Sequence, residues 1–503
     1  MTTVEPSTTA ATIPEAATTA GRVSGAWRGE AATFLGIPFA ASPTGSRRFL
    51  APQRPERWDG VRVCDRFGAT PQRRPFGPVT TIPEPSIPGD DTLSVNVFTP
   101  APGDTAAALP VLVWVHGGGY FAGSPASPWY DGRSFARDGV VVVTLSYRLG
   151  FDGFGWMRDA PLNRGILDQL AALEWVQENI RAFGGDPDRV TIAGQSAGGG
   201  SVLTLMTSPR AAGLFRGVVS HSGAAGHLAA DTVEPIGRGL AAALGVPPTR
   251  EGWLDVPEDR ILDHERDFTQ VPGALAPGAP ADRVLAVLAD DPMATTGLAF
   301  APVVDGDSVV SVADAVAAGV GGGLSLMLGA TRNEFAFPSA TPLADIVGAV
   351  RAAGVDEAAI ARYTTEVERV GDAFADSQLS VVSTFRAPAV HVASRRVAGG
   401  AGERTWLYDF AYHSPVDGLS AHCYDLPFAW DLLHADGVER VLGEAAPSAL
   451  ADEMHGRWLE FARTARVPWA PASESVRGAM VFDEHSGFDA EAYAFEAELL
   501  AGP

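Results

Sequence analysis

Residues 188–206 have the sequence DRVTIAGQSAGGGSVLTLM, which combines the patterns of a strand, a turn and a helix. Its first part, Asp188 to Ala193, is apolar and β-branched, which is typical of a buried parallel strand. Its last part, Gly199 to Met206, is small and apolar, which suits a helix packed beneath a turn. The pentapeptide between them, Gly194 to Gly198, therefore predicts a sharp strand-to-helix turn with Ser196 at its corner.

A serine at such a corner is exposed and strained, and it lies at the N-terminus of a helix, where negative charge is stabilised. Gly194 and Gly198 are expected because a Cβ at either position would collide with neighbouring backbone. The chain has 56 glycines, so the G-x-S-x-G pattern alone can arise by chance. The flanking strand and helix favour the interpretation of Ser196 as a nucleophile.

Length and composition indicate one large folded unit. The chain has 503 residues, of which 46% are hydrophobic, and no linker, repeat or block of charge divides it. Residues 1–20 are rich in Thr and Ala and contain two prolines, which predicts a disordered tail. We expect residues 21–503 to form a single domain with insertions.

The formal net charge of −23 argues against nucleic acid or an anionic membrane as a partner. No targeting or membrane-spanning segment is apparent, so we expect a cytoplasmic protein, with monomer and homodimer both open. The two cysteines, Cys64 and Cys423, form no disulfide framework and are expected to be free thiols.

The chain contains no lysine, which removes several mechanisms at once. A Walker A phosphate loop, a pyridoxal Schiff base, a Ser-Lys dyad and SxxK acylation all require one. A nucleophilic serine is therefore expected to use a histidine base. No HExxH or CxxC pattern is present, and we expect no metal and no other cofactor.

Strand and helix patterns alternate along the chain, which predicts an α/β fold with a mostly parallel, doubly wound sheet. An amphipathic helix is expected over Asp168–Phe183, ending at Gly184-Gly185. Besides the strand before Ser196, strands are expected at 110–115, 140–145, 324–328 and 405–410. In such a sheet, sites form beyond the carboxyl ends of the strands.

After the strand at 110–115 comes His116-Gly117-Gly118-Gly119-Tyr120. Consecutive glycines leave backbone N–H groups uncovered, as an oxyanion hole requires, and we predict Gly118, Gly119 and Ala197 as its donors. A dinucleotide-binding loop is one alternative, but Ser124 to Pro128 is a poor helix start. A purely structural turn is the other.

The chain order Ser, acid, His of α/β-hydrolases selects the partners. Glu334 follows a predicted strand and fits the acid, whereas its rival Asp305 suits a tight turn. Position favours His422 as the base, because it lies in a loop after a strand. His413, which ends a strand, and His434 also stay open on position alone. The remaining histidines beyond Glu334 favour a surface role, because His391 and His455 lie in helical stretches and His485 lies in the C-terminal region.

These motifs resemble those of the type B carboxylesterase family, which includes cholinesterases and bacterial para-nitrobenzyl esterases. Ordered segments carry the resemblance from about residue 21 to 484. They are 34–40, 48–49, 58–61, 93–100, 116–120, 147–150, 163–169, 179–187, 194–198, 302–306, 331–334 and 422–428.

The resemblance implies an α/β-hydrolase fold and hydrolysis of small-molecule esters through an acyl-enzyme. It implies a triad of Ser196, Glu334 and His422, and an oxyanion hole of Gly118, Gly119 and Ala197. Alternatives are a non-catalytic adhesion or binding protein of the same fold, a hydrolase of carbamates or amides, and a nicotinamide-dependent oxidoreductase.

The sequence departs from the family at four positions. Gln195 stands where many members have glutamate, Thr70 and Thr92 replace a pair of cysteines, and Asp425 replaces the usual glutamate.

Ser222 is expected to be structural. Six aromatic residues near the motif loops are expected to line an apolar gorge or, each taken singly, to belong to the core: Tyr120, Phe121, Phe151, Phe154, Trp156 and Trp430.

Overall fold

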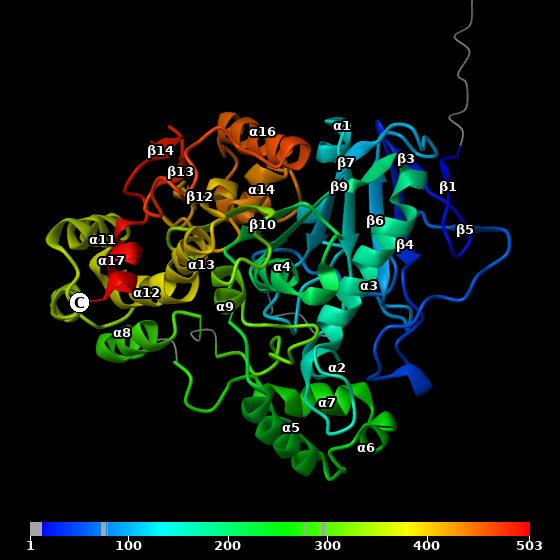
Figure 1. Ribbon diagram of the computed structural model, residues 1–503, viewed down its shortest axis with the longest axis horizontal. Helices are drawn as coiled ribbons and strands as arrows, with labels where there is room; N and C mark the ends of the chain where they lie inside the picture. Colours follow the sequence, from blue (N-terminus) through cyan, green and yellow to red (C-terminus); the bar gives the residue numbers. More distant parts are fainter. Residues whose placement is uncertain are drawn as a thin grey trace, which may run out of the picture.

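A mixed sheet of 11 strands runs through the computed structural model, with helices on both of its faces (Figure 1). The structure describes residues 13–71, 77, 79–224, 226–275, 278–293 and 297–502. In spatial order the strands are β14 (Gly487–Asp489), β13 (Ala479–Phe482), β12 (Thr405–Phe410), β11 (Ser325–Thr331), β10 (Gly217–His221), β9 (Gly185–Gln195), β7 (Leu109–Val115), β8 (Val141–Leu145), β6 (Ser94–Thr99), β4 (Ala31–Pro38) and β3 (Ala26–Arg28).

The centre of the sheet is parallel and its edges are antiparallel. Strands β8, β7, β9, β10, β11, β12 and β13 pair in parallel, whereas β3, β4 and β6 at one edge and β14 at the other pair antiparallel. The predicted α/β fold with a mostly parallel central sheet is confirmed. Because parallel neighbours point the same way, the ends of β7, β9, β11 and β12 lie along one edge.

Alternate side chains of the central strands enter two different cores. In β7, Val111, Val113 and Val115 pack into one hydrophobic cluster, while Leu112 and Trp114 pack into another. The first cluster includes side chains of α3 (Arg164–Asn179), α4 (Ala197–Thr207) and α13 (Ala387–Ala398), and the second includes those of α14 (Leu426–Ala429) and α16 (Ser448–Thr464). Burial on both faces explains why these strands are continuous apolar runs.

The connections after β10 and β11 carry the helical insertions. Helices α5 (Ala230–Leu244), α6 (Arg250–Leu254) and α7 (Glu258–Glu265) gather at the bottom of Figure 1. A third hydrophobic cluster joins α8 (Ala281–Asp290), α10 (Leu343–Ala352), α11 (Glu357–Val370), α12 (Ala375–Val381) and α17 (Ala494–Ala501). Of these helices, α8, α11, α12 and α17 lie at the left of the same view.

Two sequence expectations need correction in detail. The helix predicted from Asp168 begins at Arg164, and its last predicted turn, Ile180–Phe183, is a 3₁₀ helix that ends at Gly184 with φ 81°. The predicted tail at residues 1–20 is wrong for its last part, because β1 (Glu15–Ala17) pairs with β2 (Arg22–Ser24) and buries Ala16. Residues 1–12 of that tail lie outside the described residues.

Candidate active site

Ser196 occupies the single residue between β9 and α4. Its φ of 59° and ψ of −123° are unusual for a residue with a side chain, so the backbone is strained there. Two hydrogen bonds hold the corner: Ser196 N–H donates to the His221 carbonyl at 2.9 Å, and Gly200 N–H donates to the Ser196 carbonyl at 2.8 Å. The predicted strand–serine–helix turn is confirmed.

The two glycines of the pentapeptide are required by close backbone contacts. A Cβ on Gly194 would lie 2.4 Å from the Gly198 carbonyl oxygen, and one on Gly198 would lie 2.0 Å from the Val115 carbonyl oxygen. Both distances are far below a van der Waals contact, so neither position accepts a side chain. The turn thus presses against the end of β7, where the glycine-rich loop begins.

His422 and Glu334 form a buried pair. The Nδ1 atom of His422 bonds to Oε2 of Glu334, and the His422 backbone N–H donates to the Glu334 carbonyl at 3.0 Å. The other carboxylate oxygen, Oε1, accepts the Thr331 N–H at 2.8 Å. Glu334 is 2% exposed and has a φ of 38°, so the loop after β11 presents its carboxylate in one fixed position.

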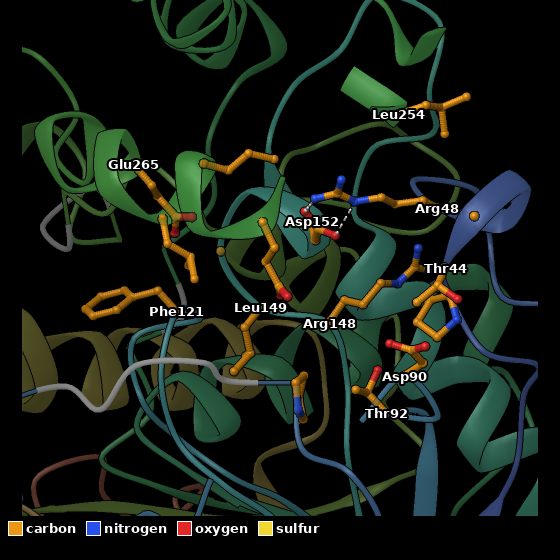
Figure 2. A pocket seen from close by; sticks show the side chains of 17 residues that line it. Thr44, Arg48, Asp90, Thr92, Phe121, Arg148, Leu149, Asp152, Leu254 and Glu265 are labelled. Atoms are coloured by element: carbon orange, nitrogen blue, oxygen red, sulfur yellow. Dashed lines mark hydrogen bonds and ion pairs between the residues drawn. The ribbon is translucent and has the colours of Figure 1, made fainter. Parts of the chain in front are cut away.

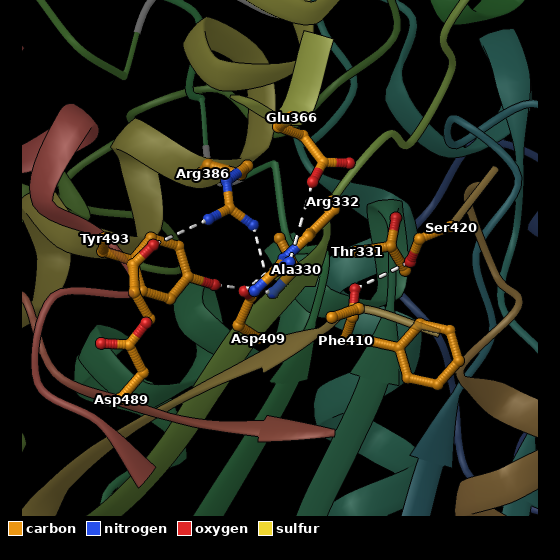
Figure 3. A network of polar contacts seen from close by, with 12 residues as sticks. Ala330, Thr331, Arg332, Glu366, Arg386, Asp409, Phe410, Ser420, Asp489 and Tyr493 are labelled. Atoms are coloured by element: carbon orange, nitrogen blue, oxygen red, sulfur yellow. Dashed lines mark hydrogen bonds and ion pairs between the residues drawn. The ribbon is translucent and has the colours of Figure 1, made fainter. Parts of the chain in front are cut away.

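A buried ion network holds the loop after β11 (Figure 3). Arg332 Nε donates to Asp409 at 2.8 Å, and Arg386 donates to the other oxygen of Asp409 at 2.7 Å. Asn333 donates to Glu366 at 3.0 Å. Burial alone would raise the pKa of Asp409, but the positive charges of Arg332 and Arg386 outweigh it and lower the pKa. The carboxylate therefore stays charged and fixes the loop that carries the predicted acid.

The Nε2 atom of His422 has Gln195, not Ser196, as its hydrogen-bond partner in the described part of the chain. It lies 2.8 Å from the amide nitrogen of Gln195, and among the described residues no hydrogen bond joins Ser196 to His422. The structure therefore brings Glu334 and His422 together next to the serine turn, with Gln195 in the place that the triad assigns to the hydroxyl. The sequence marked Gln195 as a departure without predicting this contact.

The glycine-rich loop lies directly against Ser196, since a Cβ on Gly117 would be 3.0 Å from Ser196 Cβ. Gly118 and Gly119 have φ values of 115° and 61°, which explains the need for glycine. Within the described ranges, the N–H groups of Gly118, Gly119 and Ala197 donate no intramolecular hydrogen bond. Three backbone donors beside the serine are thus available to a ligand.

Comparison with known proteins decides the family. A model of the carboxylesterase family matches residues 12–476. The chain belongs to the carboxylesterase family. It is 33% identical to the para-nitrobenzyl esterase of Bacillus subtilis over 92% of this chain and 93% of that protein, and 41% identical to the cocaine esterase of Homo sapiens over 48% and 46%.

Solved structures agree with this assignment. A carboxylesterase of Geobacillus stearothermophilus has a TM-score of 0.76 at 31% identity, covering 97% of this chain and 100% of its own. A para-nitrobenzyl esterase structure has a TM-score of 0.80 at 28% identity, covering 97% and 99%. The protein is therefore a carboxylic ester hydrolase, and the predicted family is confirmed.

Two aromatic rings cover the imidazole of this carboxylesterase, and the sequence did not reveal either. The Phe335 ring lies 4.1 Å from His422 and the Phe385 ring lies 5.1 Å from it, centroid to centroid. Phe335 is 55% exposed. Because it directly follows the predicted acid Glu334, its position in the chain was a usable signal that its ring lies near the site. Phe385 lies in a π-helical turn, Val382–Arg386, which no sequence pattern marks.

Most of the aromatic residues expected near the motif loops belong to the core. Tyr120, Phe151, Phe154 and Trp430 are at most 3% exposed, and Trp156 is half-buried beneath Arg238. Phe121 differs, because it borders a cavity of about 300 Å³ that Figure 2 shows between α2 (Gly150–Phe154) and α7. Arg48 and Asp152 form an ion pair at 3.2 Å on its wall, and no predicted triad residue lines this cavity.

The competing acid has a structural role in the carboxylesterase. Asp305 accepts three backbone N–H bonds from residues 307–309, each at 2.9 Å, so it caps the tight turn that the sequence predicted. This result leaves Glu334 as the carboxylate in contact with an imidazole near Ser196.

Two of the competing histidines have partners elsewhere. His413 bonds to Glu366 at 3.0 Å, and His455 bonds to the Ala429 carbonyl at 2.9 Å and to Asp138 at 3.2 Å. In the glycine-rich loop, burial lowers the pKa of His116 to about 4, and the side chain of His116 is therefore neutral at pH 7.

A second histidine–carboxylate pair lies inside the fold. His221 Nδ1 is 2.7 Å from Asp425, and Trp458 donates to His221 Nε2 at 2.8 Å. His221 and Asp425 are 0% exposed, and the neighbouring Ser222 hydroxyl is buried with no partner among the described residues. Asp425, which replaces the glutamate usual in the family, thus takes part in a fully buried contact between β10 and the start of α14.

Both cysteines are free and buried, as expected from their number. Burial raises the pKa of the Cys64 thiol to about 11 and that of Cys423 well above its usual value.

In the described part of the chain, no three His, Cys, Asp or Glu side chains are placed to hold a metal ion. None of the helices in the described ranges has the length and apolar character that a membrane crossing requires.

Proposed function

We propose that this carboxylesterase cleaves esters of small molecules with Ser196 as nucleophile, His422 as base and Glu334 as the acid that orients the base. The observation that carries the proposal is the buried bond between His422 Nδ1 and Glu334 beside the strained Ser196 turn. A carboxylate accepts but does not donate, so it keeps the proton on Nδ1 and leaves a lone pair on Nε2.

In the proposed reaction, His422 Nε2 takes the Ser196 proton as the serine oxygen attacks the ester carbonyl. The N–H groups of Gly118, Gly119 and Ala197 stabilise the oxyanion that forms. The protonated imidazole then delivers its proton to the leaving alcohol, and an acyl-enzyme remains. Water, activated in turn by His422, releases the acid and restores Ser196.

The N–H groups of Gly118, Gly119 and Ala197 donate to no partner among the described residues, which supports the oxyanion assignment because folded proteins leave few backbone donors unpaired without a reason. Carbamates and amides are alternative substrates for the same residues. A binding or adhesion role is disfavoured, since all three triad positions hold chemically competent side chains.

The test is labelling by an organophosphonate together with Ser196→Ala. We expect the probe to attach to the peptide containing Ser196, and the variant to lose ester hydrolysis while keeping the circular dichroism spectrum of the native protein. Turnover retained in a purified Ser196→Ala sample, or labelling at another serine, would reject the assignment. A panel of chromogenic esters, carbamates and anilides with the unmodified enzyme defines the substrate class.

A further inference from the structure

The side chain of Gln195 fills a closed space between the glycine-rich loop and His422. It is 1% exposed, and its amide nitrogen lies 2.8 Å from His422 Nε2. A Cβ on Gly117 would lie 2.8 Å from its amide oxygen, which shows that the glycine leaves room for this side chain. In the structure the amide oxygen lies toward the loop and the amide nitrogen toward the imidazole.

This orientation matches one protonation state of His422. Because Glu334 accepts at Nδ1, the proton resides there and Nε2 presents a lone pair. An amide N–H2 group donates into that lone pair and has no means of accepting from it. A hydrogen bond to the neutral form of a base favours that form.

We propose that Gln195 is a positioning residue that holds the imidazole of His422 neutral and Nδ1-protonated, and yields Nε2 to the Ser196 hydroxyl when substrate binds. This step rests on the proposed function, because it assigns His422 as the base. An uncharged amide keeps the base available at lower pH, whereas a carboxylate in the same place would stabilise the imidazolium and remove the lone pair.

The other groups around the imidazole of His422 contact its Nδ1 atom or its face, so the contact between Nε2 and Gln195 is the one that a substitution can change. Glu334 faces Nδ1, and the rings of Phe335 and Phe385 cover the imidazole face. Cys423 follows in the chain. Burial first, and then the charges of Asp425 and Glu334, raise the pKa of its thiol, while a hydrogen bond with the Gln195 side chain lowers it by less, so the thiol stays protonated. A carboxylate at residue 195 would be the first negative charge placed against Nε2.

The experiment compares the pH profile of kcat/KM in the native enzyme, Gln195→Glu and Gln195→Met. We expect the acid limb to move to higher pH by about one unit or more in Gln195→Glu, since a nearby opposite charge shifts a pKa by about 1–3 units. Gln195→Met removes the donor without adding charge, so its upward shift is smaller. Gln53→Glu adds the same charge at an exposed glutamine and leaves the acid limb in place.

A second readout is independent of turnover. NMR titration of ¹⁵N-labelled histidine in the Ser196→Ala background follows Nε2 of His422, which is assigned by its loss in a His422→Asn variant. The same order of midpoints, native below Gln195→Met below Gln195→Glu, supports the proposal, and any other order overturns it. Should Gln195→Glu fail to fold, the comparison of Gln195→Met with the native side chain decides. Failure of the triad itself would appear separately, as activity retained in Ser196→Ala.

Discussion

Replacing Glu334 by Gln tests how the buried carboxylate acts on His422. Both oxygens of Glu334 accept N–H donors, one from the Thr331 backbone at 2.8 Å and one from His422 Nδ1. A glutamine must turn its NH2 group toward one of these donors, which costs about 1–3 kcal/mol for the unsatisfied contact. If the amide nitrogen faces Nδ1, the imidazole adopts the wrong tautomer and Nε2 no longer accepts the serine proton.

The lost charge adds a second effect. A carboxylate and an imidazolium about 4 Å apart attract each other by about 4 kcal/mol at an effective dielectric constant of about 20. Since about 1.4 kcal/mol corresponds to tenfold in rate, this contribution alone is about a thousandfold. Together the two effects amount to about 5–7 kcal/mol and predict that kcat falls by about 10⁴- to 10⁵-fold in Glu334→Gln.

The assay is kcat for a chromogenic ester, with the rate of phosphonate labelling as a direct measure of serine reactivity. Asp138→Asn is the matched control, because Asp138 also pairs with a histidine, His455, and takes no part in the network that holds the loop after β11. We expect the control to keep kcat within about tenfold. A Glu334→Gln enzyme that also stays within tenfold would refute the role assigned to this carboxylate.

The oxyanion loop and the ion network give two further predictions. Gly118→Ala places a Cβ 2.2 Å from the Ala122 carbonyl oxygen, so the loop must shift and kcat should fall by about 10²- to 10³-fold; activity within tenfold of native would contradict this. Asp409→Asn leaves Arg332 and Arg386 without their shared carboxylate and should lower the free energy of unfolding in urea by about 3 kcal/mol at pH 7. Because the folded pKa of Asp409 is lowered, its contribution is present above the unfolded value of about 3.9 and is lost as pH falls through the folded pKa. The difference from native should therefore shrink under acidic conditions, and a constant difference would contradict the assignment.

The elements nearest the serine were the most predictable. The strand, Ser196 and the following helix were correct because a β-branched run, paired glycines and a small apolar run each favour one local structure. The ordered end of the predicted tail was missed, since β1 has three residues and is held by pairing with β2 rather than by its own Ala-rich sequence. Short edge strands of this kind depend on their partner.

The sequence predicted which residues belong to the candidate site but not which contacts they make. Chain order and family motifs selected Ser196, Glu334 and His422, and the structure adds the Glu334–His422 bond. It also shows Gln195 at Nε2 and the rings of Phe335 and Phe385 over the imidazole, and these residues lie 227, 87 and 37 positions away in sequence from His422. No local pattern reports which side chain fills the space beside a ring nitrogen.

The central strands, the turn at Ser196 and the exclusion of lysine-based chemistry could be read from the order and composition of residues, because they follow from local steric preference and from the residue types present. The tertiary structure alone decided which hydrogen bonds His422 makes. Packing places β9, the loop after β11 and the loop after β12 at one sheet edge, and only that convergence sets the glutamine amide, the carboxylate and the imidazole within bonding distance. Hydrogen bonds between distant segments depend on distances of a few ångströms that the order of residues does not encode locally.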